Sequence, residues 1–165
     1  MHDLSSFEPA VRALAERLRA RGWRIAAAES CTGGLLAAAC TALAGSSDWF
    51  ERGFVTYSNA AKTEQLGVDA ALIAAHGAVS AETARAMALG AVARSHADLG
   101  VAITGIAGPG GAVPGKPVGT VWLALARRGD AQASASLLQL AGDRAAVREA
   151  SVGAALAALH ATAAE

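Results

Sequence analysis

The sequence predicts an α/β protein, built as a single three-layer α/β/α domain around a mixed, mostly parallel sheet. Short apolar segments with strand character alternate along the chain with segments of helical period, an order typical of this class. A late pair of strand-like segments joined by a tight turn makes the sheet mixed rather than purely parallel. The length of 165 residues allows one domain with a substantial core, and we expect residues 1–165 to form it.

The first part of the chain predicts helix, strand, helix and strand in that order. Apolar residues recur at i, i+4, i+7 and i+11 in the amphipathic helix expected over 7–22. Residues 24–29 (RIAAAE) are short and apolar, which is typical of a buried strand. The small residues at 30–34 turn the chain into a helix over 35–43. The β-branched and aromatic run at 54–57 (FVTY) predicts the second strand.

The middle of the chain predicts two capped helices, a strand and a long loop. Ser58 and Ser80 are each placed to cap the start of a helix. Residues 99–104 (LGVAIT) predict the next strand. The segment 104–120 contains six glycines and three of the four prolines of the chain, which favours a shaped loop over a plain connection.

The last part of the chain predicts a hairpin and a closing helix. Segments 120–125 and 133–138 have strand character and flank the turn at 127–130 (RRGD). A helix with apolar residues at i, i+4 and i+7 is expected to run from just past Gly142 to about His160.

Composition narrows the classes of partner. The 14 basic and 14 acidic residues cancel, so the chain lacks the basic stripe that nucleic acid binding requires, although one phosphorylated metabolite could still bind. The longest apolar stretch, 35–44, is about half the length of a membrane span. The first residues lack the pattern of a signal peptide, so we expect a cytoplasmic protein. We also expect it to act on a small molecule and not at a membrane, and to form a homo-oligomer.

Cysteine and histidine usage gives no sign of a metal or a cofactor. Cys31 and Cys40 would lie on opposite faces of one helix, too far apart for a disulfide, which fits a reducing compartment. The four histidines are scattered and share no metal-ligand spacing with the cysteines or acidic residues. We therefore expect chemistry that uses neither a metal nor a cofactor.

Three polar or glycine-rich loops follow predicted strands, at the edge where α/β sheets bind ligands. In the first, Ser30 at a strand end has the layout of a nucleophile elbow. The N–H groups of Thr32, Gly33 and Gly34 would favour an oxyanion or a phosphate. The alternative is an ordinary helix cap with glycines in a tight turn.

Lys62 is the candidate base in the second loop, 57–62. Lysine occurs only at 62 and 116, whereas arginine fills the other twelve basic positions. A lysine can act as a base near neutral pH only if burial or the helix dipole lowers its pKa from about 10.4. The alternative is a solvated lysine on a short helix.

The third loop, 104–119, has glycines that would let its backbone approach a ligand closely, and the alternative is a rigid structural loop.

Two further residues are candidates for the site. Ser47 could lie near Lys62 if its loop folds over the site, although a helix cap is the simpler interpretation. Arg144 could bind a carboxylate or phosphate through two hydrogen bonds. The simpler interpretation is a surface arginine in the first turn of a helix.

Taken together, these segments resemble the CinA C-terminal-domain family of nicotinamide-nucleotide amidases. The resemblance covers most of the chain, in the order and spacing of the family. The matching stretches are AAAESCTGGLLAA (26–38), GSSDWFERGFVTYSNAAKTEQLGV (45–68), GAVSAETARAMA (77–88), AITGIAGPGG with KPVGTVWLA (102–124) and GDR (142–144).

The resemblance implies hydrolysis of the carboxamide of nicotinamide mononucleotide to nicotinic acid mononucleotide and ammonia, in pyridine-nucleotide recycling, by a serine and a lysine without a metal. Lys62 resembles the base of the family, Tyr57 and Arg144 its supporting residues, and either Ser30 or Ser47 its nucleophile. Nothing here resembles the additional N-terminal domain of longer members, so we expect a stand-alone enzyme. The expected substrate-binding residues are Thr32, Gly33, Gly34, Thr104, Gly105, Gly108 and Arg144.

Two other functions stay open at this point. The chain could be a nucleotide-binding regulatory module without catalysis, linked to competence or DNA damage, or a Ser/Lys amidase that acts on another amide. Comparing nicotinamide mononucleotide with nicotinamide and short peptides as substrates would discriminate between them.

Overall fold

The computed structural model describes residues 3–165 and contains one five-stranded sheet in the order β2-β1-β3-β4-β5. β1 pairs in parallel with β2 and β3, whereas β4 is antiparallel to β3 and to β5. Four strands thus run in one direction and β4 in the other, which confirms the mixed, mostly parallel sheet. The strands are β1 (Ile25–Glu29), β2 (Phe50–Val55), β3 (Leu99–Gly105), β4 (Thr120–Arg127) and β5 (Ser134–Gln139).

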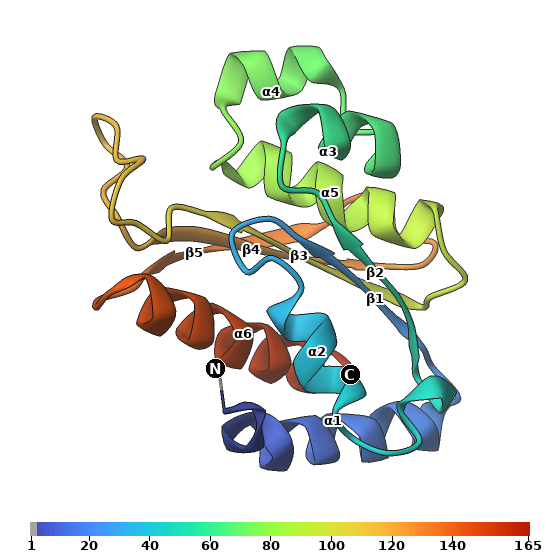
Figure 1. Ribbon diagram of the computed structural model, residues 1–165. Helices are drawn as coiled ribbons and strands as arrows, with labels where there is room; N and C mark the ends of the chain where they lie inside the picture. The colour runs from blue at the N-terminus through green and yellow to red at the C-terminus, as the bar shows by residue number, and fades with distance from the viewer. Residues whose placement is uncertain (1–2) are drawn as a thin grey trace.

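Helices cover both faces of the sheet, which confirms the three layers (Figure 1). α1, α2 and α6 lie on one face, and α3, α4 and α5 lie on the other. The helices are α1 (Glu8–Arg21), α2 (Leu35–Thr41), α3 (Asn59–Leu66), α4 (Ala70–His76), α5 (Ala81–Ala93) and α6 (Arg144–Thr162), with short 3-10 turns at Leu4–Phe7 (η1) and Ser46–Asp48 (η2).

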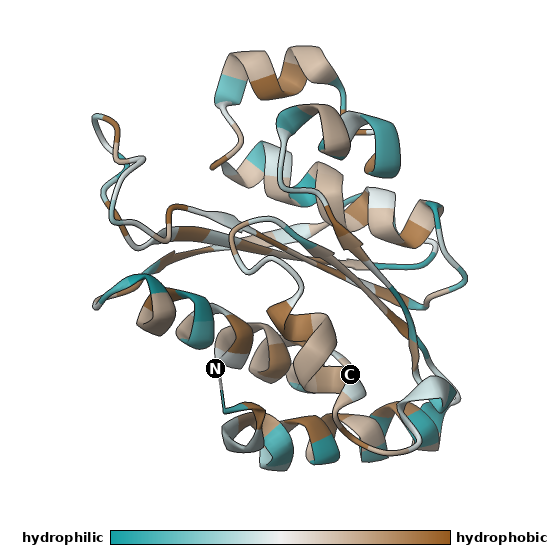
Figure 2. Cartoon of the chain, in the orientation of Figure 1, coloured by the Kyte–Doolittle hydropathy of each residue, from teal (hydrophilic) through white to brown (hydrophobic). Residues whose placement is uncertain are grey.

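Two apolar cores lie on the two sides of the sheet because successive strand residues point to opposite faces. In β1, Ile25 and Ala27 pack with α1, α2 and α6, whereas Ala26 and Ala28 pack with α5. All five residues of β1 are buried. Figure 2 shows the central strands as apolar over most of their length. A strand buried on both faces therefore reads as a continuous apolar run in the sequence.

The predicted helix starts and stops are confirmed by their capping contacts. Ser58 accepts a hydrogen bond from the Ala61 N–H, and Ser80 accepts one from the Thr83 N–H. Gly22 ends α1 with a φ of 66°, which L side chains rarely adopt. Within residues 3–165, no helix has the length and apolar composition needed to cross a membrane.

The second strand and one helix differ from the prediction. β2 spans Phe50–Val55 rather than 54–57, because as an edge strand it tolerates the charged pair Glu51-Arg52 that hides its period. The short helix α4 was not expected. It begins where the Asp69 side chain accepts a hydrogen bond from the Ala71 N–H.

The topology opens a crevice at one edge of the sheet. β1 and β3 are neighbours, but the chain leaves β1 towards β2 on one side and leaves β3 towards β4 on the other. Where connections diverge in this way, the carboxyl ends of the strands are the usual site for a ligand. The loops that follow β1, β2 and β3 therefore meet at this edge.

Candidate active site

A pocket of about 270 Å³ lies at the carboxyl ends of β1 and β3. Its walls come from the residues after β1, the β2–α3 connection with α3 itself, the turn before α5, the end of β3 with the glycine-rich loop that follows it, and the first residue of α6. Of the eleven residues predicted for the site, seven line it: Ser30, Tyr57, Lys62, Thr104, Gly105, Gly108 and Arg144.

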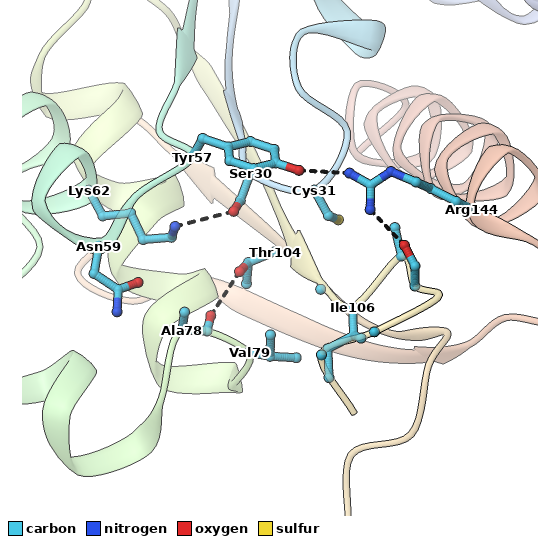
Figure 3. A pocket seen from close by; sticks show the side chains of 15 residues that line it. Ser30, Cys31, Tyr57, Asn59, Lys62, Ala78, Val79, Thr104, Ile106 and Arg144 are labelled. Atoms are coloured by element: carbon cyan, nitrogen blue, oxygen red, sulfur yellow. Dashed lines mark hydrogen bonds between the residues drawn. The ribbon is translucent and has the colours of Figure 1, made fainter. Parts of the chain in front are cut away.

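Ser30 and Lys62 meet inside this pocket (Figure 3). Lys62 Nζ lies 3.2 Å from Ser30 Oγ and donates a 2.9 Å hydrogen bond to the carbonyl of Thr56. Ser30 follows the last residue of β1, and its N–H donates to the Ile103 carbonyl of β3. Lys62 lies on α3, whose start is capped by Ser58. The end of β1 and the helix α3 thus hold a hydroxyl and an amine at hydrogen-bond distance.

The amine of Lys62 is buried without a carboxylate partner. The residue is 1% exposed, and desolvation by burial lowers the pKa of its ammonium below the ordinary value of 10.5. Its two contacts, within residues 3–165, are a hydroxyl and a carbonyl oxygen, neither of which carries a full charge. Burial without a countercharge favours the neutral amine, which can accept a proton.

Tyr57 and Arg144 meet across the mouth of the same pocket. Arg144 Nη2 donates to Tyr57 Oη at 2.7 Å, and Nη1 donates to the carbonyl of Gly108 at 2.8 Å. Arg144 begins α6, and Asp143 caps that helix by accepting from the Ala146 N–H. The Arg144 guanidinium therefore connects α6 with Tyr57 and with the glycine-rich loop. It also places a positive charge at the pocket (Figure 3).

Thr104 and Gly105 shape the floor of the pocket. The hydroxyl of Thr104 donates to the Ala78 carbonyl at 2.8 Å, which ties the end of β3 to the turn before α5. A Cβ at Gly105 would lie 2.6 Å from a side-chain carbon of Val121 and 2.8 Å from the Thr120 carbonyl oxygen, so only glycine fits there. These residues hold the loops together rather than offering a free hydroxyl.

Thr32, Gly33 and Gly34 do not line the pocket, contrary to expectation. Thr32 is fully buried, and the N–H of Gly33 donates to the Ser30 carbonyl at 3.0 Å to close the turn. The carboxylate of Glu29 occupies the first turn of α2, which leaves no open helix start for an oxyanion or phosphate at this point.

Ser47 also lies away from the pocket. It is exposed in η2, which precedes β2. β1 and β2 are parallel and pair Ile25 with Phe50 at their starts. η2 therefore lies at the amino ends of these strands, whereas Ser30 lies at the carboxyl end of β1. The structure brings Ser30, and not Ser47, to Lys62.

Several pocket residues were not among the predicted site residues. Asn59, Ala78, Val79 and Ile106 come from three separate segments and have no shared spacing that a sequence pattern could reveal. Cys31 also lines the pocket, and burial raises the pKa of its thiol to about 11. Its place directly after Ser30 was the one available signal. Among residues 3–165, no group of three or more His, Cys, Asp or Glu side chains could hold a metal ion.

Comparisons with known proteins show the family to which the chain belongs. The chain is 53% identical over 131 residues to nicotinamide-nucleotide amidohydrolase PncC of Enterobacter agglomerans, covering 79% of each chain. It is 53% identical over 144 residues to the protein of the same name from Pseudomonas putida, covering 87% of this chain and 88% of that one. A CinA-like protein of Citrifermentans bemidjiense is 57% identical over 135 residues, but this chain covers only 32% of its length.

A solved structure of the competence/damage inducible protein CihA from Agrobacterium tumefaciens superposes with a TM-score of 0.90. The two chains are 44% identical, and the match covers 94% of each. The model of the CinA C-terminal domain matches residues 8–163. The chain therefore belongs to the CinA C-terminal domain family.

Proposed function

We propose that this chain hydrolyses the carboxamide of nicotinamide mononucleotide to nicotinic acid mononucleotide and ammonia, as part of pyridine-nucleotide recycling. The names of two relatives, both nicotinamide-nucleotide amidohydrolases, support an amidase of this class. The observation that carries the mechanism is the amine of Lys62, buried without a countercharge and 3.2 Å from the Ser30 hydroxyl. The cytoplasmic location and the homo-oligomeric state expected from the sequence stay predictions.

The proposed reaction begins with transfer of the Ser30 hydroxyl proton to the neutral amine of Lys62. Ser30 Oγ attacks the carboxamide carbon and forms a tetrahedral intermediate, whose oxyanion would be held by backbone N–H groups of the glycine-rich loop. The C–N bond then breaks as the ammonium of Lys62 returns its proton to the departing nitrogen, which leaves as ammonia. Water, deprotonated by the same amine, hydrolyses the resulting ester and restores Ser30.

Tyr57 and Arg144 have supporting roles in this proposal. The guanidinium is held by Tyr57 Oη and the Gly108 carbonyl, so it presents its charge at the pocket rather than in open solvent. A fixed guanidinium binds phosphate or carboxylate oxygens well. We therefore assign Arg144 to the substrate phosphate, with Tyr57 orienting both the guanidinium and the substrate.

The test is release of ammonia from nicotinamide mononucleotide by the purified protein, compared with nicotinamide and a short peptide amide. We expect turnover of the nucleotide and a loss of at least a hundredfold in Ser30→Ala, since the nucleophile is removed. Ser47→Ala decides between the two candidate serines, and we expect it to retain turnover. Binding of the nucleotide without ammonia release would instead support a regulatory module, and preference for another amide would overturn the substrate.

A further inference from the structure

Glu29 is a buried carboxylate directly beside the proposed nucleophile. It ends β1, is 1% exposed and precedes Ser30 in the chain. Its two oxygens accept hydrogen bonds from the N–H groups of Leu36 at 2.9 Å and Ala37 at 3.0 Å. The side chain is therefore turned towards α2, and Glu29 is absent from the residues that line the pocket.

This contact replaces the local cap that other helices have. α3, α4, α5 and α6 each begin with a serine or aspartate whose side chain accepts an N–H from the helix's own first turn. α2 begins instead at Gly34, which offers no side-chain cap. Glu29 supplies the acceptors from the preceding strand, seven and eight residues earlier in the chain. An N-terminal carboxylate is also favoured by the helix dipole.

The turn that carries Ser30 is consequently held at both ends. On the strand side, the Ser30 N–H donates to the Ile103 carbonyl, and within the turn the Gly33 N–H donates to the Ser30 carbonyl. On the helix side, the Glu29 carboxylate fixes the first turn of α2. Because Glu29 and Ser30 are adjacent, the contact that ties Glu29 to α2 also constrains the backbone that carries the Ser30 hydroxyl.

We propose that Glu29 is a positioning residue, which holds Ser30 Oγ at hydrogen-bond distance from Lys62 by anchoring α2 to the end of β1. This inference rests on the proposed roles of Ser30 and Lys62. Glu29 touches neither the pocket nor the amine, so its contribution is geometric. A displacement of about 1 Å at a reacting group can lower turnover a hundredfold.

The test compares Glu29→Gln, which keeps the shape but has one oxygen acceptor, with Glu29→Asp, which keeps the charge but is shorter by one methylene. For Glu29→Gln we expect kcat to fall by ten- to a hundredfold, KM to stay within about threefold, and the pH dependence of kcat to keep its inflection. Hydrogen exchange at the Leu36 and Ala37 amides should become faster. Glu29→Asp should recover part of kcat.

A matched control separates positioning from a general loss of stability. Val152→Ala removes buried methyl groups from α6 in the same core and also lowers Tm, but it should leave kcat at 25 °C unchanged. The inference is overturned if Glu29→Gln speeds exchange at the Leu36 and Ala37 amides without lowering kcat. It is also overturned if Glu29→Gln and Val152→Ala lower kcat by the same factor when their Tm values are equal.

Labelling of Ser30 by a serine-reactive sulfonyl fluoride keeps this test independent of the substrate. We expect the labelling rate of Ser30 in Glu29→Gln to be ten- to a hundredfold lower than in the unmodified chain. This expectation holds even if nicotinamide mononucleotide proves to be the wrong substrate. Equal labelling rates in the two proteins, or no labelling of the unmodified chain, would overturn the inference. Labelling of Ser30 in an unmodified chain that releases no ammonia from the nucleotide would instead overturn the proposed function, and full turnover by Ser30→Ala would overturn the proposed role of Ser30.

Discussion

Replacing Lys62 with methionine tests the central claim about the site, that a lysine amine is held neutral by burial. Methionine has a similar length and no titratable group. It removes the proposed base, and general base catalysis contributes about a hundred- to ten-thousandfold in known enzymes. We expect ammonia release to fall by a factor in that range. Lys116→Met is the matched control, since Lys116 is the other lysine of the chain and does not line the pocket, and it should retain activity.

The same substitution has a predicted effect on stability that depends on pH. The pKa of Lys62 in the folded protein lies below its ordinary value of 10.5, so between those two values the unfolded chain binds up to one proton more than the folded chain. The free energy of unfolding therefore gains up to about 1.4 kcal/mol for each pH unit across that window, and the gain ends near the ordinary pKa. Lys62→Met lacks this contribution.

Denaturant unfolding of both proteins at pH 7, 8, 9 and 10 measures the effect. Other titrating groups are common to both proteins and cancel in the difference, apart from the Cys31 thiol, whose charge interacts with the Lys62 ammonium. Methionine also leaves the Thr56 carbonyl without its hydrogen bond, which costs about 1–3 kcal/mol at every pH. The difference between the two unfolding free energies should move in favour of the unmodified chain as pH rises. A difference that is constant with pH would refute the reasoning.

The remaining predictions concern the thiols, the packing and the assembly. Burial raises the pKa of Cys31 to about 11, so about one thiol in a thousand is ionised at pH 8; iodoacetamide should label it far more slowly in native than in denatured protein, as measured by mass spectrometry. Arg128 donates to three backbone carbonyls in the last turn of α5 and just after it, and Arg128→Ala should lower the unfolding free energy by about 2–3 kcal/mol; an unchanged denaturant midpoint would contradict this. A Cβ at Gly90 would lie 2.2 Å from the Leu66 carbonyl oxygen, whereas one at Gly153 would meet nothing within 4 Å; Gly90→Ala should therefore lower Tm and Gly153→Ala should not. Sedimentation equilibrium checks the expected homo-oligomer, and a species with the mass of a single chain would count against it.

Much of the fold could be predicted because its signals are local. The apolar run at β1, the serines that cap α3 and α5, and Gly22 at the end of α1 each depend on only a few neighbouring residues. β2 was misplaced because the charged pair Glu51 and Arg52 lies in an edge strand, where the alternation of strand residues is weak. α4 was missed because its seven residues are too few to establish a helical period.

The candidate site could be predicted in part, since its residues follow strands whose ends meet at one edge. Ser30 and Lys62 were predicted from their places directly after β1 and on the short helix that follows β2, and the structure puts them 3.2 Å apart. Thr32 and its two glycines were expected to face a ligand, but the long-range contact from Glu29 takes the start of α2. A glutamate at the end of a strand does not reveal which helix it will reach.

The amino-acid sequence by itself determined the fold class, the family and the loops that carry the candidate chemistry, because these depend on periodicity and on local motifs. Only the tertiary structure decided between Ser30 and Ser47 as the partner of Lys62, since that choice depends on which end of the parallel strands β1 and β2 each loop occupies. The tertiary structure also removed the Lys62 amine from water. Burial is a property of the packed domain, and it lowers the pKa only when residues distant in the sequence close around the amine.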